Sequence, residues 1–267
     1  PEIVRNTPEV IAAYLGGTDY QATPRDTPWQ GSRDATLFVK NLTLDYGAAP
    51  VLNGVEFVVN PGELVAILGA NGAGKTTLFN TIAGDYPPTS GRVILFGQDV
   101  TRLPSHRRTR RGLRRTYQNS LLFGGLSVQD NIYLALKGLE PGRLSLRRPE
   151  PDDFLFQRAI DIGTGLGLDT ILSSHVADIS HGQQRQLEIA MAVAGTPKLI
   201  LLDEPAAGLS PAERIGLVQL LQQIPRQISI IIIEHDMEVA LRVAERITVM
   251  HQGAIVVEGT PQEIQEN

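Results

Sequence analysis

The sequence has 267 residues, 42% of them hydrophobic and 20% charged, which is enough chain and apolar material for a globular protein with a buried core. Its net charge of −5 gives no general attraction to nucleic acid. The chain contains no cysteine, which excludes disulfides and thiolate metal sites and suits a reducing compartment. No apolar run approaches the roughly 20 residues of a membrane-spanning helix.

The first 34 residues form two segments with different patterns. Residues 18–34 are polar, contain proline and show no apolar periodicity, which predicts a linker. Residues 1–17 open with a pattern that recurs at the other end of the chain, as if they completed its last helix. The matching residues are Glu2, Ile3 and Asn6 at the start and Glu263, Ile264 and Asn267 at the end.

Two kinds of β-strand are predicted after the linker. Residues 36–46 and 51–59 alternate between apolar and polar side chains, which predicts an antiparallel pair. Three short continuous apolar runs instead predict parallel strands buried on both faces, with helical spacing between them. Strands that alternate with helices indicate an α/β domain, and the strand-poor stretch from about 113 to 180 predicts a helical insertion. The three runs are 64–68, 199–202 and 228–233.

A phosphate-binding loop follows the first of these buried strands. Its sequence GANGAGKTT fits the pattern G-x-x-x-x-G-K-[ST], in which glycines let successive N–H groups point at one phosphate beside a helix N-terminus. Lys75 then reaches the terminal phosphates, and the Thr76 hydroxyl is a ligand for Mg²⁺. A glycine-rich turn without a ligand is the alternative, but the strand before the loop and the helix after it favour a nucleoside-triphosphate site. The predicted contacts are Gly69, Asn71, Gly72, Ala73, Gly74, Lys75, Thr76 and Thr77.

The run SHRRTRRGLRR, which ends at Arg115, is strongly basic. Sites for nucleic acid usually interleave aromatic side chains with the charge, and this run contains no aromatic residue. We therefore expect a solvated helix face near Gln118 and no nucleic-acid partner, with binding of RNA or lipid headgroups as the alternative.

Two further polar motifs flank the second buried strand. Before it, Ser180 and Gln183 fit the S-x-x-Q capping box, which predicts that a helix begins with Ser180 as its N-cap. After it, Asp203 and Glu204 stand at the end of a parallel strand, where strand ends meet a ligand. Asp203 can hold the water shell of Mg²⁺, and Glu204 can accept a proton from an attacking water. An acidic pair that only caps the strand is the alternative.

The motifs stand in a characteristic order: the phosphate loop, a Tyr-Gln pair, the capping-box motif, the acidic pair, and an isolated histidine after the third buried strand. In this order residues 35–267 resemble the ABC ATPases, the nucleotide-binding subunits of ABC transporters. The resemblance implies a P-loop NTPase fold of the ABC type. In that fold helices flank a mainly parallel sheet, beside an antiparallel β subdomain and a helical subdomain at about 113–190.

The resemblance also implies how ATP and Mg²⁺ are bound. In that family two subunits enclose two ATP molecules, and a helix of one subunit points its N-terminus at the terminal phosphate held by the other. Ser180, Gly182 and Gln183 would therefore act on ATP bound to a second nucleotide-binding domain. Within one subunit, the resemblance implies that Gln118 senses Mg²⁺ and the membrane subunit. It implies that His235 contacts the terminal phosphate and the catalytic water, and that Tyr46 stacks on adenine.

Two residues depart from the family pattern. Histidine stands at position 181, where the family usually has the first of two glycines, so the His181 side chain must point away from the phosphate. Gly182, which permits close approach, is present, and we expect function to survive. Ser210 stands where a loop that contacts the partner subunit usually ends in aspartate, so the family's contact at this position is not implied here.

The segments SHGQQRQLEIA, DEPAAGL and IIEHDMEVA are most similar to the ATPase subunits of branched-chain amino acid importers, with importers of urea or short amides as alternatives. This likeness implies permease partners, an external substrate-binding protein contacted only indirectly, and a position on the cytoplasmic face of the cell membrane. The basic helix face near Gln118 would then be turned toward the permease. A soluble ABC protein of translation or DNA repair is the alternative from another class, but the sequence shows neither a second phosphate loop nor heptads. The intact Lys75, Glu204 and His235 argue against an inactive regulatory module.

Subunits of this type commonly end with a short helix and a P-E-V-x-x-x-Y-L-G-like tail, which PEVIAAYLGG at residues 8–17 resembles. We therefore expect residues 1–17 to be the end of a preceding ATPase domain, joined by the 18–34 linker to the domain at 35–267. A circular permutation would give the same pattern, and an ordinary amphipathic helix is the simpler alternative. In a tandem chain the pairing partner would be the fused neighbour, and otherwise a second copy or a separate homologue.

Overall fold

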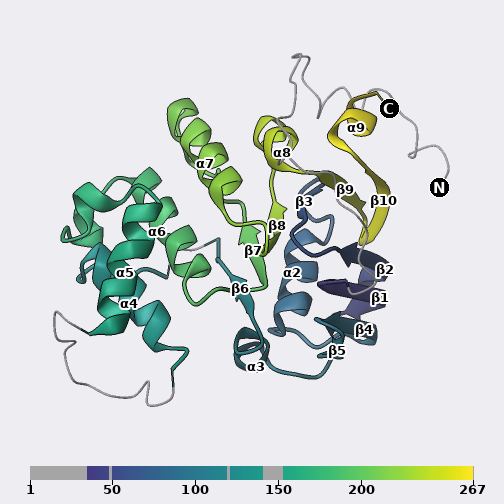
Figure 1. Cartoon of the computed structure of the whole chain (residues 1–267). Helices are drawn as coiled ribbons and strands as arrows, with labels where there is room; N and C mark the ends of the chain where they lie inside the picture. The colour runs from purple at the N-terminus through teal and green to yellow at the C-terminus, as the bar shows by residue number, and fades with distance from the viewer. Residues whose placement is uncertain (1–34, 48–49, 119–120, 141–152, 267) are drawn as a thin grey trace.

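The computed structural model describes residues 35–47, 50–118, 121–140 and 153–266, and its strands form two sheets (Figure 1). The first sheet has the order β2-β1-β4-β5 and is antiparallel throughout, which confirms the predicted pairing of the first two strands. The predicted tail and linker lie outside the described residues. The strands of this sheet are β1 (Leu37–Asp45), β2 (Pro50–Val59), β4 (Ser90–Leu95) and β5 (Gln98–Asp99).

The second sheet, as described, has the order β10-β9-β3-β8-β7-β6. Strands β9, β3, β8, β7 and β6 run parallel, and β10 pairs antiparallel with β9 at one edge. Every residue of β3, β7 and β8 is buried, which confirms the three predicted parallel strands covered on both faces. The strands are β3 (Leu64–Leu68), β6 (Leu113–Arg115), β7 (Leu199–Asp203), β8 (Ser229–Ile233), β9 (Arg246–His251) and β10 (Ala254–Gly259).

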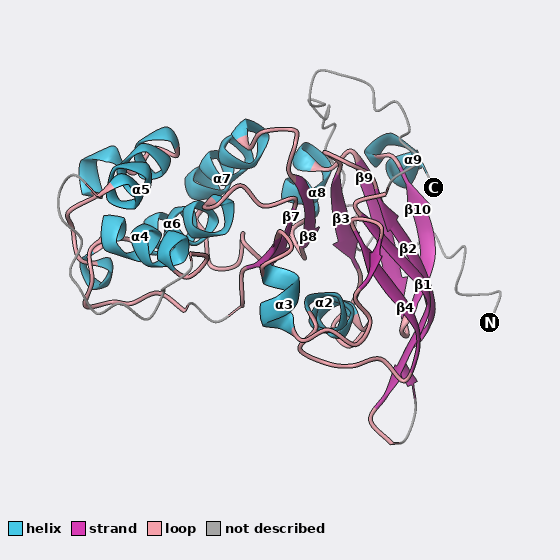
Figure 2. Cartoon of the chain, turned by 60° about the horizontal axis from the view of Figure 1, so that its bottom comes forward, coloured by secondary structure: helices cyan, strands magenta, loops and turns pink. Residues whose placement is uncertain are grey.

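Alternate residues of the central strands enter two different hydrophobic clusters. Val65 and Ile67 of β3 join a cluster shared with the antiparallel sheet and α2, whereas Ala66 and Leu68 join a cluster shared with α6, α7 and α8. The parallel sheet is therefore the middle layer, with an apolar cluster on each face (Figure 2). Burial of each Ile or Leu side chain contributes about 1.5–3 kcal/mol to the stability of this packing. The helices are α2 (Lys75–Ala83), α6 (His181–Val193), α7 (Pro211–Gln223), α8 (Met237–Val243) and, at the end, α9 (Pro261–Glu266).

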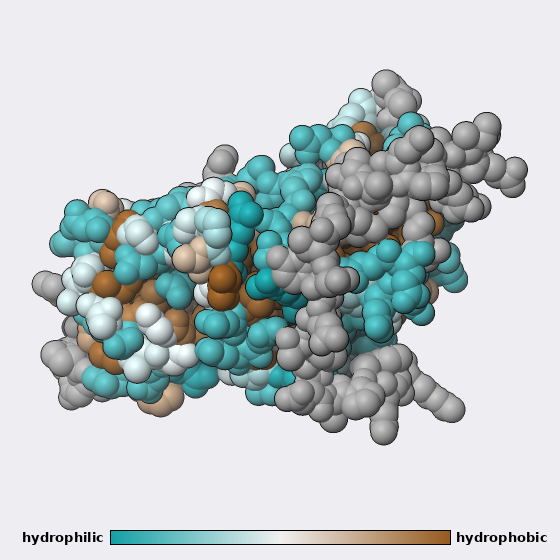
Figure 3. All heavy atoms as spheres, turned by 90° about the horizontal axis from the view of Figure 1, so that it is seen from above, coloured by the Kyte–Doolittle hydropathy of each residue, from teal (hydrophilic) through white to brown (hydrophobic). Residues whose placement is uncertain are grey.

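A helical part lies to one side of the sheets, at the left of Figure 1. Helices α4 (Val128–Lys137) and α5 (Phe154–Gly165) pack there with α6 around a third hydrophobic cluster. Figure 3 shows apolar residues in brown at the surface of this end of the molecule. None of the helices in the described ranges is long and apolar enough to cross a bilayer.

One short strand lies inside the stretch that the sequence predicted to be helical. Residues 113–115 form β6, which extends the parallel sheet beside β7. The strand has only three residues and two of them are arginines, so no apolar run marks it in the sequence. The helical part therefore begins after β6 and not at residue 113.

The basic run is a solvated surface only in part, which corrects the sequence prediction: Arg107, Arg110 and Arg111 are exposed, but Arg108 is not. Only Ser105–Thr109 form a helix, α3, and within it Arg108 is 1% exposed. The Arg108 guanidinium donates hydrogen bonds to the carbonyl oxygens of Thr81 and Ile82 in the last turn of α2, at 2.7 and 2.8 Å, and to two further carbonyls. Burial lowers the pKa of Arg108 to about 10, so the side chain stays charged at neutral pH and anchors the far end of α2.

Replacement of Arg108 by methionine is expected to lower the free energy of unfolding by roughly 2–4 kcal/mol, because buried carbonyl oxygens lose their donor. Urea denaturation followed by circular dichroism measures this change. The matched control is Arg107→Met, at an exposed position of the same helix, with an expected change of about 0.5 kcal/mol or less. Equal losses in the two variants would attribute the effect to the charge of the run and not to the buried bonds of Arg108.

Candidate active site

The phosphate loop joins the C-terminal end of β3 to the start of α2. Gly69 has φ 149° and Gly74 has φ 98°, conformations that residues with a side chain rarely adopt. A Cβ atom at Gly69 would lie 2.3 Å from the carbonyl oxygen of Met250, and one at Gly74 would lie 2.9 Å from that of Val51. Helix α2 begins without a side-chain cap, which leaves its first N–H groups to water or to an anion.

Lys75 lies over this loop and close to the predicted acidic pair. Its ammonium group donates hydrogen bonds to the carbonyl oxygens of Gly69 and Ala70, at 2.6 and 3.0 Å. Burial lowers the pKa of Lys75, whereas the carboxylates of Glu204 and Asp203 raise it. The fold therefore brings the loop and the acidic pair together, as the sequence predicted.

Glu204 is held between two side chains from different segments. The Nε2 atom of Gln118 donates a hydrogen bond to Oε2 of Glu204 at 3.2 Å, and Nε2 of His235 lies 2.7 Å from Oε1. The backbone of Glu204 has φ 49°, in the left-handed region, and its N–H donates to the carbonyl oxygen of Ile233 at the end of β8. Because β7 and β8 are neighbouring parallel strands, they present the carboxylate and the imidazole at the same edge of the sheet.

Asp203 ends β7 and has a buried partner that the sequence did not indicate. Arg115 of β6 donates to Oδ2 of Asp203 at 3.1 Å, and its guanidinium also bonds Asn80 and Asp85. Burial raises the pKa of Asp203, whereas the charge of Arg115 lowers it and favours the ionised form. The guanidinium lies 4.8 Å from the ring centroid of Tyr117, so Arg115 connects Asp203 to the segment that carries Gln118.

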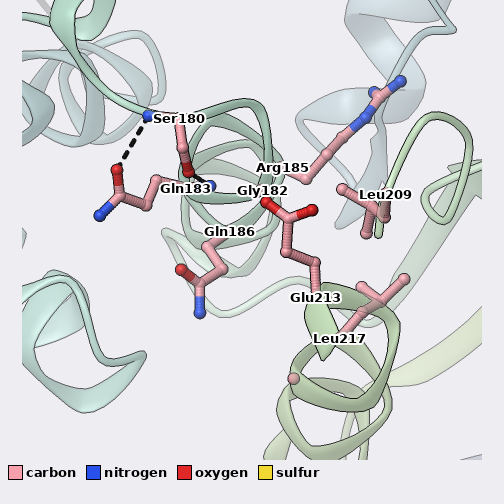
Figure 4. A pocket seen from close by; sticks show the side chains of 9 residues that line it. Ser180, Gly182, Gln183, Arg185, Gln186, Leu209, Glu213 and Leu217 are labelled. Atoms are coloured by element: carbon pink, nitrogen blue, oxygen red, sulfur yellow. Dashed lines mark hydrogen bonds between the residues drawn. The ribbon is translucent and has the colours of Figure 1, made fainter. Parts of the chain in front are cut away.

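Helix α6 begins with Ser180 as its N-cap, which confirms the predicted capping box. The Ser180 hydroxyl accepts from the N–H of Gln183 at 3.2 Å, and the Gln183 amide oxygen accepts from the N–H of Ser180 at 2.9 Å. A hollow of about 120 Å³ lies between this helix end and α7, and Glu213 of α7 points across it toward Gly182 (Figure 4). Across the described part of the chain, no hydrogen bond or ion pair joins Ser180, Gly182 or Gln183 to the phosphate loop or to Glu204.

A family model described as "ABC transporter" matches residues 52–207, more than half of the chain. The chain belongs to the ABC transporter family. Within the family it is an ATPase subunit, with the cassette fold that the sequence resemblance implied.

Three known proteins illustrate the likeness. This ABC ATPase is 35% identical over 242 residues to the high-affinity branched-chain amino acid transport ATP-binding protein BraF of Pseudomonas aeruginosa, with 86% of this chain and 94% of BraF covered. It is 36% identical over 231 residues to the lipopolysaccharide export system ATP-binding protein LptB of Escherichia coli, with 86% and 92% covered. The dimeric structure of a post-hydrolysis state of the ATP-binding cassette MJ0796, bound to ADP and Pi, superposes with a TM-score of 0.72 at 25% identity, with 84% and 98% covered.

The two departures of this ABC ATPase from the family pattern have local structural counterparts. His181 is exposed at the start of α6, and its Cε1 would lie 3.3 Å from a Cβ atom at Gly208, so the imidazole lies beside the segment that follows β7. Ser210 is the N-cap of α7, where its hydroxyl and its N–H donate to Glu213 at 2.7 and 2.8 Å. These bonds from Ser210 lower the pKa of Glu213, and the N–H of Gly182 lowers it further.

Magnesium fits the donors at this edge of the sheet. Asp203 offers a carboxylate, Thr76 an exposed hydroxyl in the first turn of α2, and Gln118 an amide, and oxygen atoms are the ligands that Mg²⁺ prefers. No group of three His, Asp or Glu side chains within the described residues could hold a metal by itself. A magnesium ion bound here would therefore share its coordination with phosphate oxygens and water.

Tyr46 follows β1 and is 62% exposed, so its ring is open to a ligand. The ring of Tyr86 meets it edge-on, with 6.1 Å between the centroids and 90° between the planes. The sequence does not indicate a role for Tyr86, because a tyrosine between Gly84 and Pro87 matches no motif. An exposed ring steadied by a second aromatic suits stacking on a base, and the adenine contact of Tyr46 stays a prediction.

Proposed function

We propose that this ABC ATPase powers the import of branched-chain or other hydrophobic amino acids. The support is its 35% identity to BraF, whose name describes branched-chain amino acid transport, and the likeness of the three segments around its site motifs. LptB, at a similar identity, is named for lipopolysaccharide export. Importers of urea or short amides share the same motifs, so the transported substrate is what the experiment below decides.

In this proposal Glu204 is the residue that activates water for ATP hydrolysis. Glu204 accepts the proton of the water that attacks the terminal phosphate of ATP, as a general base. Gln118 and His235 each hold one oxygen of its carboxylate, at 3.2 and 2.7 Å, so the base is oriented before the water arrives. Lys75 and the first N–H groups of α2 bind the phosphates. Magnesium, when bound at Thr76, Gln118 and Asp203, would neutralise charge on the phosphate oxygens.

The helix that begins at Ser180 serves a second nucleotide-binding domain in this proposal. Its N-terminal residues Ser180, Gly182 and Gln183 would face the terminal phosphate of ATP held by that domain. The dimeric arrangement named for MJ0796 supports this pairing. Within the described residues, this helix end forms no hydrogen bond with the phosphate loop or with Glu204 of its own chain. The second domain would be another copy, a fused neighbour or a separate homologue.

Permease subunits are proposed to dock on the helical part. Three of its apolar side chains stand well out of the surface: Leu121 at 67%, Phe123 at 54% and Phe154 at 73% exposed. Exposed aromatic and aliphatic side chains of this kind are typical of interaction surfaces. Bound in this way, the ATPase would lie on the cytoplasmic face of the cell membrane. It would contact an external substrate-binding protein only indirectly and would need no nucleic acid.

The proposal is tested by tagging the full-length native protein, solubilising membranes in mild detergent, and identifying the co-purifying proteins by mass spectrometry. Permeases of amino-acid importers are the expected partners. Capture of permeases for urea or amides, or of export components, would change the proposed substrate to the one that those proteins transport. Capture of ribosomal or DNA-repair proteins alone would contradict a transport role. Phe123→Glu is expected to weaken the capture of permeases. The control Ile215→Glu, at a 48% exposed position of α7, is expected to leave it unchanged.

A further inference from the structure

Glu234 is a buried acidic residue beside the proposed site. It directly follows the apolar strand β8, it precedes His235, and only 2% of its surface is exposed. A buried carboxylate lowers stability unless hydrogen bonds compensate it. Glu234 belongs to none of the sequence motifs, although an acidic residue directly after four consecutive isoleucines is an unusual pattern.

The Glu234 carboxylate joins two segments of the backbone. Its Oε1 accepts the N–H of Ala206 at 2.8 Å, in the segment that follows β7. Its Oε2 accepts the N–H of His235 at 3.2 Å and, more weakly, that of Asp236 at 3.5 Å. Glu204 precedes Ala206 by two residues, so one side chain ties the backbone that carries the general base to the backbone that carries its imidazole partner.

We propose that Glu234 is a positioning residue for ATP hydrolysis, which fixes the segments of Glu204 and His235 relative to each other. It acts through the backbone on either side of the 2.7 Å contact between those two side chains. A misplacement of about 1 Å in an active site can lower the rate about 10²-fold, so a fixed distance at this point affects turnover. The inference rests on the roles proposed above for Glu204 and His235.

The raised pKa of Glu234 indicates that this carboxyl does not stabilise the fold by its charge. Burial raises the pKa of this carboxyl to about 7, while the N–H groups of Ala206, Asp236 and His235 oppose the rise and the charge of Asp236 adds to it. An unfolded glutamate loses its proton near pH 4.5, so the burial of Glu234 lowers the stability of the fold as pH rises from there through about 7. Glutamine would remove this cost, and stability alone therefore does not explain a glutamate here.

The test is the steady-state ATPase activity of Glu234→Gln in the full-length chain. Glutamine has the same size as glutamate and keeps one acceptor oxygen. Its NH₂ group, however, faces a backbone N–H and cannot accept a hydrogen bond from it. We expect kcat to fall by about 10- to 100-fold, while KM for ATP stays near the wild-type value. The urea midpoint is expected to move little, because the relief from burying a charge and the loss of one N–H acceptor have opposite effects on stability. Glu234→Asp keeps the charge but is one methylene shorter, and is expected to lose kcat similarly because it cannot reach both segments.

The matched control is Glu63→Gln, which changes another buried carboxylate. Glu63 is 6% exposed at the opposite end of β3, where it pairs with Arg246 at 2.6 Å. This variant is expected to shift the urea midpoint and to leave kcat within about twofold. An unchanged kcat in folded Glu234→Gln would overturn the inference, and so would two Glu234 variants that both fail to fold, since the role would then be structural. Glu204→Gln measured in parallel tests the site itself: if that variant keeps its turnover, the proposed function fails and not Glu234.

Discussion

Replacement of Glu204 by glutamine is expected to lower ATP turnover by roughly 10²–10⁴-fold, the usual contribution of a general base. Glutamine has the same size and can keep contacts with Gln118 and His235, but its amide cannot take a proton from water. Nucleotide affinity is expected to stay near the wild-type value, because Lys75 and the phosphate loop are unchanged. Phosphate release at saturating ATP measures the first quantity, and titration with a fluorescent ATP analogue measures the second.

The matched control for this experiment is Glu238→Gln. Glu238 is a surface glutamate of α8, where it pairs with Arg242 of the same helix at 3.0 Å, and its loss is expected to leave turnover unchanged. Retained hydrolysis in Glu204→Gln would remove Glu204 from the role of base. The proton acceptor would then have to be another group at the same sheet edge.

Replacement of Gly182 by alanine is expected to lower ATP turnover by roughly 10²–10³-fold, the cost of losing one backbone donor at a developing charge. The proposed role of Gly182 is to bring its N–H against the terminal phosphate held by the second domain, and a methyl group would hold that phosphate off. The same methyl group would also meet the chain's own Glu213, since a Cβ atom there lies 2.3 Å from Oε1. Phosphate release measures the combined effect.

A double variant separates these two causes. In Gly182→Ala with Glu213→Ala the intramolecular clash is relieved, so stability against urea is expected to recover toward that of Glu213→Ala alone. Turnover is expected to stay low, because the methyl group still faces the partner's phosphate. Recovery of turnover in the double variant would show that position 182 is glycine only to accommodate Glu213, and the action of this helix on a second domain would lose its support.

The layers of this fold could be predicted from local pattern, because the signals are contiguous. The apolar runs of β3, β7 and β8 are buried along their whole length, and the glycines of the phosphate loop and the Ser180 cap are each read within a few residues. The meeting of Gln118, Glu204 and His235 is different. Their positions are far apart in the chain, and only the order of motifs, through the family resemblance, predicted that they belong to one site.

The partners of the charged residues could not be predicted in this way. Arg107, Arg108 and Arg115 belong to one basic run, yet Arg107 is exposed, Arg108 ends inside the fold at α2, and Arg115 meets Asp203. Which arginine is buried depends on which element packs against it, and the count of charges contains no such information. The contact between Glu213 and the start of α6 could not be predicted for the same reason, since it depends on how α7 lies beside α6.

The left-handed backbone of Glu204 has a consequence for laboratory evolution. Only glycine adopts φ 49° without strain, and other residues there cost on the order of 1 kcal/mol, with asparagine among the least affected. A library randomised at position 204 and sorted by heat resistance alone should therefore enrich Glu204→Gly and Glu204→Asn. The same library sorted by phosphate release should return glutamate. Selection for robustness and selection for turnover thus pull this one codon in opposite directions, and thermostabilised forms of the protein are best sought with position 204 held constant.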